Sequence, residues 1–104
     1  MNIEGKKIAI LSITKNGKKL GLRIKTKIPS AHLYYVKKNA IEQECDVIYI
    51  NKKLKEFIPE IFNEYEYIIF IMACGIVVRA IAPLLENKFL DPAILVCDEK
   101  GKML

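Results

Sequence analysis

Histidine, tryptophan and cysteine are scarce in this sequence. It has one histidine, His32, no tryptophan, and three cysteines, Cys45, Cys74 and Cys97. A single histidine excludes a histidine metal site, and an odd number of widely spaced cysteines suggests neither a disulfide framework nor a zinc site. We therefore expect reduced, buried thiols and no metal held by protein ligands. His32 is expected to pack or to lie at the surface rather than to catalyse.

The common catalytic motifs are absent as well. The chain has no Gly-x-Ser-x-Gly elbow, no His-Glu-x-x-His pair, no Cys-x-x-Cys pair and no serine with an evident partner base. Gly17 and Gly21 have neither the spacing of a dinucleotide fingerprint nor the Lys-Ser/Thr of a Walker loop. They favour a turn and a helix start over a phosphate-binding loop.

Long apolar runs are missing too. None is long enough to cross a bilayer, and Arg79 interrupts the best of them. No basic-then-apolar signal peptide opens the chain, since Glu4, Lys6 and Lys7 precede the apolar run at Ile8. We therefore expect a cytoplasmic protein that has no membrane partner.

The net charge of +5 comes mostly from lysine. A basic protein attracts polyanions, whether nucleic acids or acidic small molecules. These lysines are scattered over several predicted elements, whereas nucleic-acid binding by counterion release requires charges gathered on one side. A solvated basic surface is the better interpretation, and no nucleic-acid partner is expected.

Strand and helix patterns alternate along all 104 residues. Short apolar runs predict strands at 7–14, 32–36, 47–50, 68–72 and 93–97. Apolar spacings of three and four predict helices after Gly17, over 52–64 and after Gly75. Pro29 and Pro83 should end helices, and Pro59 should kink its helix or start a second one.

This alternation predicts one α/β domain, a three-layer open, mostly parallel sheet with helices on both faces. The turn at 98–101 would add a carboxyl-terminal antiparallel edge strand at 102–104. Such an unfinished edge would allow pairing with a second copy of the chain, so a homo-oligomer is compatible with the sequence.

The stretch from Tyr67 to Leu85 passes from a buried strand through a glycine turn into a helix. Ligands of open α/β sheets bind at the carboxyl edge, where helix N-termini favour anions. We expect a carboxylate-binding site there, formed by Cys74, Gly75, Arg79 and Lys88, with Asp91 and Asp98 as weaker candidates for catalysis. Arg79 and the aspartates also have structural alternatives. Arg79 could extend its charged end into solvent or pair with Asp91 or Asp98, and the two aspartates could simply form turns.

The segment from Met72 to Leu85, with Lys88, Asp91-Pro92-Ala93 and Asp98-Glu99-Lys100-Gly101, resembles the amino-terminal domain of the cobalamin-biosynthesis protein CbiG. That family shows Ala-x-Gly-Ile-x-Val-Arg-x-Ile-Ala-Pro, Lys-x-x-Asp-Pro-Ala and Asp-Glu-x-Gly in this order. The resemblance implies a cobalt-precorrin-5A hydrolase of anaerobic vitamin B12 synthesis. Such an enzyme opens a lactone and releases acetaldehyde, giving cobalt-precorrin-5B. No cofactor is implied, because the substrate carries the cobalt.

In the family, a Ser-Gly-His-x-Gly-Gly-Ala-Asn segment and a further domain follow the Asp-Glu-x-Gly turn. The sequence given ends before them, at Leu104. The resemblance therefore implies a substrate-binding domain whose partner is the missing carboxyl-terminal part, and whether these residues alone catalyse stays open. The alternative is a non-catalytic flavodoxin-like module that binds a phosphate ligand or a partner protein.

Overall fold

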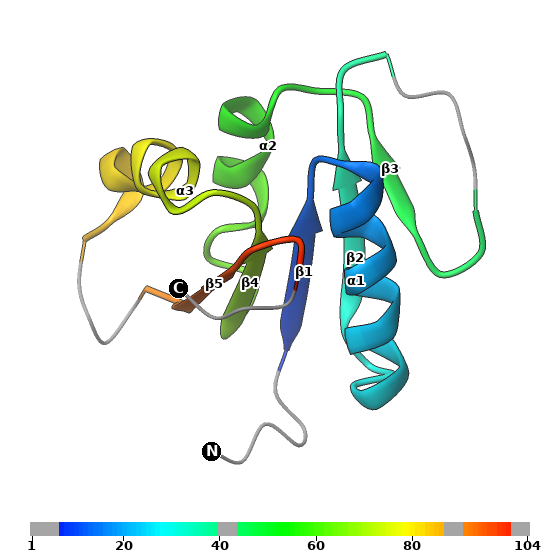
Figure 1. The fold of residues 1–104 in the computed structure, drawn as a ribbon. Helices are drawn as coiled ribbons and strands as arrows, with labels where there is room; N and C mark the ends of the chain where they lie inside the picture. The colour runs from blue at the N-terminus through cyan, green and yellow to red at the C-terminus, as the bar shows by residue number, and fades with distance from the viewer. Residues whose placement is uncertain (1–6, 40–43, 87–90, 101–104) are drawn as a thin grey trace.

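The structure, a computed structural model, describes residues 7–39, 44–86 and 91–100. In these residues the strands alternate with helices along the chain (Figure 1). The elements are β1 (Ile8–Ser12), α1 (Lys15–Lys27), β2 (His32–Val36), β3 (Ile48–Ile50), α2 (Leu54–Ile61), β4 (Tyr67–Ile71), α3 (Cys74–Ile81), the 3₁₀ helix η1 (Ala82–Leu84) and β5 (Ala93–Cys97). No helix in the described residues is long and apolar enough to span a membrane.

The five described strands form one sheet in the order β3-β2-β1-β4-β5, and every neighbouring pair is parallel. The first three strands proceed outward in one direction, and the chain then returns to place β4 on the other side of β1. The order therefore reverses between β1 and β4. In doubly wound sheets this switch point is where a crevice forms at the carboxyl ends of the strands.

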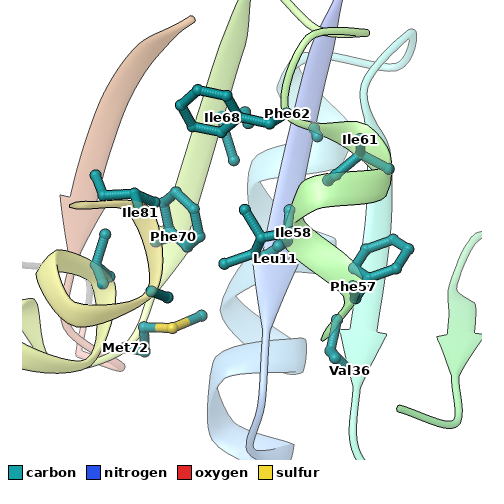
Figure 2. Packing of buried hydrophobic residues seen from close by; sticks show 13 residues of the cluster. Leu11, Val36, Phe57, Ile58, Ile61, Phe62, Ile68, Phe70, Met72 and Ile81 are labelled. Carbon is teal, nitrogen blue, oxygen red and sulfur yellow. The ribbon is translucent and has the colours of Figure 1, made fainter. Parts of the chain in front are cut away.

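Two apolar layers hold helices to the two faces of this sheet. On β1, Ala9 and Leu11 face α2 and α3, whereas Ile8 and Ile10 face α1. Figure 2 shows Phe57, Ile58 and Ile61 of α2, with Phe62 just after the helix, directed at the sheet side chains. The predicted three-layer α/β architecture is thus confirmed for the sheet and its helices, and all the described strands are parallel rather than most of them.

Helix α1 faces the sheet with two buried glycines, Gly17 and Gly21. A Cβ added at Gly17 would lie 3.3 Å from the Ile71 carbonyl oxygen, and one added at Gly21 only 2.6 Å from Cδ1 of Leu33. Both glycines therefore allow α1 to pack against the sheet, a role that was not predicted from the sequence, which indicated a turn and a helix start.

Proline ends α3 but does not break α2. The helix α3 stops at Ile81 and continues only as η1, which contains Pro83. Pro59, in contrast, lies inside α2, and the N–H of Phe62 still donates to the Ile58 carbonyl at 2.9 Å. Of the two alternatives expected at Pro59, a kink or a second helix start, the second is wrong, because α2 runs through Pro59 as one helix.

The predicted antiparallel edge strand is not supported. Strand β5 forms the sheet edge and pairs parallel with β4, and residues 102–104 lie outside the described part. After β5 the chain crosses toward β1 instead of turning back (Figure 1), and Glu99 accepts a hydrogen bond from the Thr14 hydroxyl. That contact draws the segment away from the free edge of β5.

The expectation of buried cysteines was wrong for two of the three. Cys45 and Cys74 are exposed, and only Cys97 is buried. Cys45 belongs to a connection between strands, and Cys74 opens α3 on its solvent side. At Cys97, burial and then the nearby charge of Asp98 raise the pKa of the thiol.

Candidate functional site

A crevice opens at the switch point, along the carboxyl ends of β1, β4 and β5. Its volume is about 660 Å³, which falls within the roughly 300–1,000 Å³ of small-molecule sites. We call it the switch-point crevice. Its lining consists of Ile13, Thr14, Asn16, Lys19, Leu20, Arg23, Met72, Ala73, Ile76, Asp98, Glu99 and Lys100.

Two helices begin at this crevice, and their N-termini differ. At α1 the Thr14 side chain caps the helix, because its Oγ1 accepts the Gly17 N–H at 3.0 Å. At α3 the N-cap residue is Ala73, which offers no side chain for capping. Within the described residues, the N–H groups of Cys74 and Gly75 thus have neither a backbone acceptor nor a side-chain cap, and they suit an anionic ligand.

The segment after β5 borders the mouth of the crevice. Glu99 accepts a hydrogen bond from the Thr14 hydroxyl. The Oδ1 atom of Asp98 accepts the Lys100 N–H at 3.0 Å. Thr14 therefore connects the segment after β5 to the start of α1. This contact holds one side of the crevice mouth next to the N-terminus of α1.

The predicted residues of α3 lie beside the crevice, not in its lining. Cys74, Gly75 and Arg79 are all exposed. A Cβ at Gly75 would lie 3.6 Å from Nη2 of Arg79, so the guanidinium folds back over the first turn of its helix. Arg79 follows Ile76, which does line the crevice, by three residues on the same side of the helix. Within the described residues Arg79 forms no ion pair, so its expected pairing with an aspartate is not seen.

The two candidate aspartates lie at opposite edges of the sheet. Asp98 follows β5 and lines the crevice, as expected. Asp91 precedes β5, and its Oδ2 accepts the Glu86 N–H at 2.8 Å. Its expected place at the carboxyl edge is therefore corrected, because in a parallel sheet a residue before a strand lies at the amino edge. Lys88 lies outside the described residues.

Sequence reasoning missed the α1 wall of the crevice. Lys19 and Arg23 line it, yet in the sequence they look like ordinary cations of a solvated helix. The available signal was their spacing of four residues on a helix that leaves the carboxyl end of the first strand. The strand order was not predicted from the sequence, and it is this order that places β4 next to β1 and β5 next to β4, and so brings both strands to the α1 side of the crevice.

A second hollow lies at the amino edge, where Nδ1 of His32 is 2.7 Å from the Tyr65 hydroxyl. That hydroxyl is 2.6 Å from the Tyr34 hydroxyl, and burial together with this bond raises the pKa of Tyr65. We place the candidate site at the switch-point crevice because the helix N-termini face the carboxyl edge. In the described residues no cluster of His, Cys, Asp or Glu could hold a metal ion.

Comparison with known proteins tests the resemblance. The model of the cobalamin synthesis G amino-terminal family matches residues 56–104. The cobalt-precorrin-5A hydrolase of Priestia megaterium is 33% identical over 96 residues, which cover 90% of this chain and 26% of that protein. The resemblance to the cobalamin synthesis G amino-terminal domain is confirmed.

Further similar proteins support the same resemblance. The cobalt-precorrin-5A hydrolase of Salmonella typhimurium is 42% identical over 66 residues, covering 52% of this chain and 19% of that protein. A crystal structure described as a cobalamin biosynthesis protein G homolog from Sulfolobus solfataricus superposes with a TM-score of 0.64 and 27% identity, over 91% of this chain and 26% of that one. The chain thus spans about a quarter or less of the length of these relatives.

Proposed function

We propose that this chain acts as the substrate-binding amino-terminal domain of a cobalt-precorrin-5A hydrolase. The observation that carries the proposal is the identity of 33% to such a hydrolase along 90% of the chain. Because the chain spans 26% of that relative, lactone opening and acetaldehyde release are proposed for the complete enzyme, to which this domain contributes.

The geometry of the carboxyl edge suits the proposed ligand. A precorrin is a flat, largely apolar ring with acetate and propionate arms at its rim. The switch-point crevice offers apolar side chains beside cations, and the uncapped N-terminus of α3 offers N–H donors to a carboxylate. Part of the ring can lie against this edge, while its cobalt arrives as part of the substrate.

We assign Arg79 the role of holding a substrate carboxylate or a developing oxyanion. Its guanidinium lies over Gly75, so the side chain and the first N–H groups of α3 can bind the same anion. Cys74 lies at the same helix start, and Lys88 remains a proposed carboxylate ligand from the sequence. Asp98 is proposed to orient a water molecule, since it lines the crevice.

The test is a visible-absorbance titration of this chain with a cobalt corrinoid whose arms are free carboxylates, with acetaldehyde measured in parallel. We expect binding by the wild type and about tenfold weaker binding by Arg79→Ala, since a charge-assisted hydrogen bond contributes about 1.5–3 kcal/mol. Arg79→Lys is the matched control and should retain part of the affinity, because it keeps the charge but loses the planar fork.

The same titration with flavin mononucleotide tests the alternative of a phosphate-binding module. Saturable binding of the flavin phosphate together with no spectral change from the corrinoid would overturn the hydrolase proposal. Acetaldehyde release by this chain alone would show that its 104 residues contain the catalytic groups as well.

A further inference from the structure

We infer that Lys19 and Arg23 form a carboxylate-binding pair on the α1 wall of the switch-point crevice, so that the crevice binds the acidic rim of a flat, apolar macrocycle. This inference rests on the proposed function in naming a precorrin as the ligand. It goes further because it assigns carboxylate binding to two cations of α1 as well as to Arg79 of α3. No sequence motif indicates that α1 takes part in binding.

The first argument is the position of the two cations. Lys19 and Arg23 stand four residues apart on α1, so their side chains project from one flank of the helix, about 6 Å apart along its axis. Both line the crevice and both are exposed. In the described part of the chain neither side chain forms an ion pair. Two unpaired cations at this spacing can bind two neighbouring carboxylate arms.

Lys18 shows by contrast that a basic side chain of α1 can be fully engaged in the fold. Its Nζ pairs with Glu44 at 2.9 Å and with the Tyr49 hydroxyl at 3.0 Å. The neighbouring positions Lys18 and Lys19 thus have separate roles. Lys18 joins α1 to the edge of the sheet, whereas Lys19 lines the crevice.

The second argument is the apolar surface beside these cations. Leu20, Met72 and Ile76 line the same crevice. Ile76 remains 39% exposed although it faces this hollow, whereas the next residue, Val77, is 1% exposed in the core. An apolar side chain left accessible beside unpaired cations fits a ligand that has an apolar face and an anionic rim.

The third argument is the distribution of negative charge, which orients such a ligand. Asp98 and Glu99 lie at the mouth, where Glu99 contacts Thr14 at the N-cap of α1. Lys19 and Arg23 lie further along α1, about 7 and 13 Å from Thr14 on the helix axis. Lys100 lines the crevice next to these two carboxylates and offsets one of them, whereas the α1 flank carries two cations. Acidic arms are therefore attracted more strongly along the α1 flank and should point toward α1.

The experiment compares Lys19→Gln, Arg23→Gln and the double variant with the matched control Lys27→Gln. Lys27 belongs to the same helix and is exposed, but it does not line the crevice. Dissociation constants are measured by visible absorbance with two cobalt corrinoids, one with free carboxylate arms and one with the same arms converted to amides. Each change removes one exposed positive charge, so circular dichroism should be unchanged.

We expect each single crevice variant to weaken binding of the carboxylate corrinoid about tenfold, the double variant more, and Lys27→Gln less than twofold. The amide corrinoid should bind the wild type more weakly and with no dependence on either crevice residue. Equal losses for Lys27→Gln and Arg23→Gln, or unchanged binding by the double variant, would overturn this inference while the proposed function stands. Failure of the wild type to bind either corrinoid would contradict both.

Discussion

The charged head of Lys18 contacts a carboxylate and two aromatic rings. The head pairs with Glu44 and lies 5.4 Å from the ring centroid of Tyr35 and 5.6 Å from that of Tyr49. The Tyr49 hydroxyl also donates to Oε2 of Glu44 at 2.9 Å. One cation therefore connects α1, the connection before β3 and β3 itself. These bonds raise the pKa of Lys18 and lower the pKa of Glu44.

The lowered pKa of Glu44 makes this cluster sensitive to acid. A carboxyl whose folded pKa lies below its ordinary value of 4.5 stabilises the fold above that pH, and the contribution is lost as the pH falls through the folded pKa. We expect Glu44→Gln to lower the free energy of unfolding at pH 7 and to have little effect near pH 2, as measured by urea denaturation.

Glu60→Gln is the control for this prediction. Glu60 pairs with Lys52, and both side chains are nearly half exposed, at 49% and 46%. An exposed ion pair of this kind contributes about 0–1 kcal/mol. A penalty for Glu44→Gln that is the same at both pH values would show that the carboxylate of Glu44 is not held by Lys18.

Among the elements, α1 depends most on a single side chain at its start. Thr14 accepts the Gly17 N–H and donates to Glu99, so it caps the helix and ties down the segment after β5. We expect Thr14→Ala to lower the free energy of unfolding by about 1 kcal/mol, the usual effect of losing an N-cap. Chemical denaturation measures this loss.

Thr14→Ser keeps the hydroxyl and is the matched variant. It should retain most of the stability, because serine caps helices at least as well as threonine. If serine and alanine destabilise equally, the methyl group rather than the cap and the Glu99 contact would account for the effect of Thr14.

Most elements could be predicted from sequence because local pattern and tertiary burial agree in them. The strands β2 and β5 span the predicted residues 32–36 and 93–97, where short apolar runs stand between turn residues. At Pro59 local pattern and tertiary burial disagreed. The alternative of a second helix start assumed that local backbone preference decides, whereas burial of Phe57, Ile58 and Ile61 against the sheet keeps α2 continuous.

At the scale of the whole molecule, the site depends on the strand order. The sequence motifs predicted the α3 side of the carboxyl edge and, after β5, Asp98. The α1 wall could not be predicted because exposed lysines and arginines occur on most helices. Only the placement of β4 beside β1 brings Met72 and Asp98 opposite Lys19 and Arg23. Cys45 and Cys74 were misplaced for a related reason, since apolar neighbours in sequence do not bury a residue on the outer side of a turn.

The central claim is that a carboxylate-bearing corrinoid binds at the switch-point crevice. The most direct measurement is an NMR titration of the ¹⁵N-labelled chain with a cobalt corrinoid that has free carboxylate arms. We predict that the amide signals that shift or broaden belong to residues 13–23, 73–79 and 98–100, which surround the crevice and the start of α3. Changes confined to the amino edge around His32 and Tyr65, or no saturable change, would contradict the account.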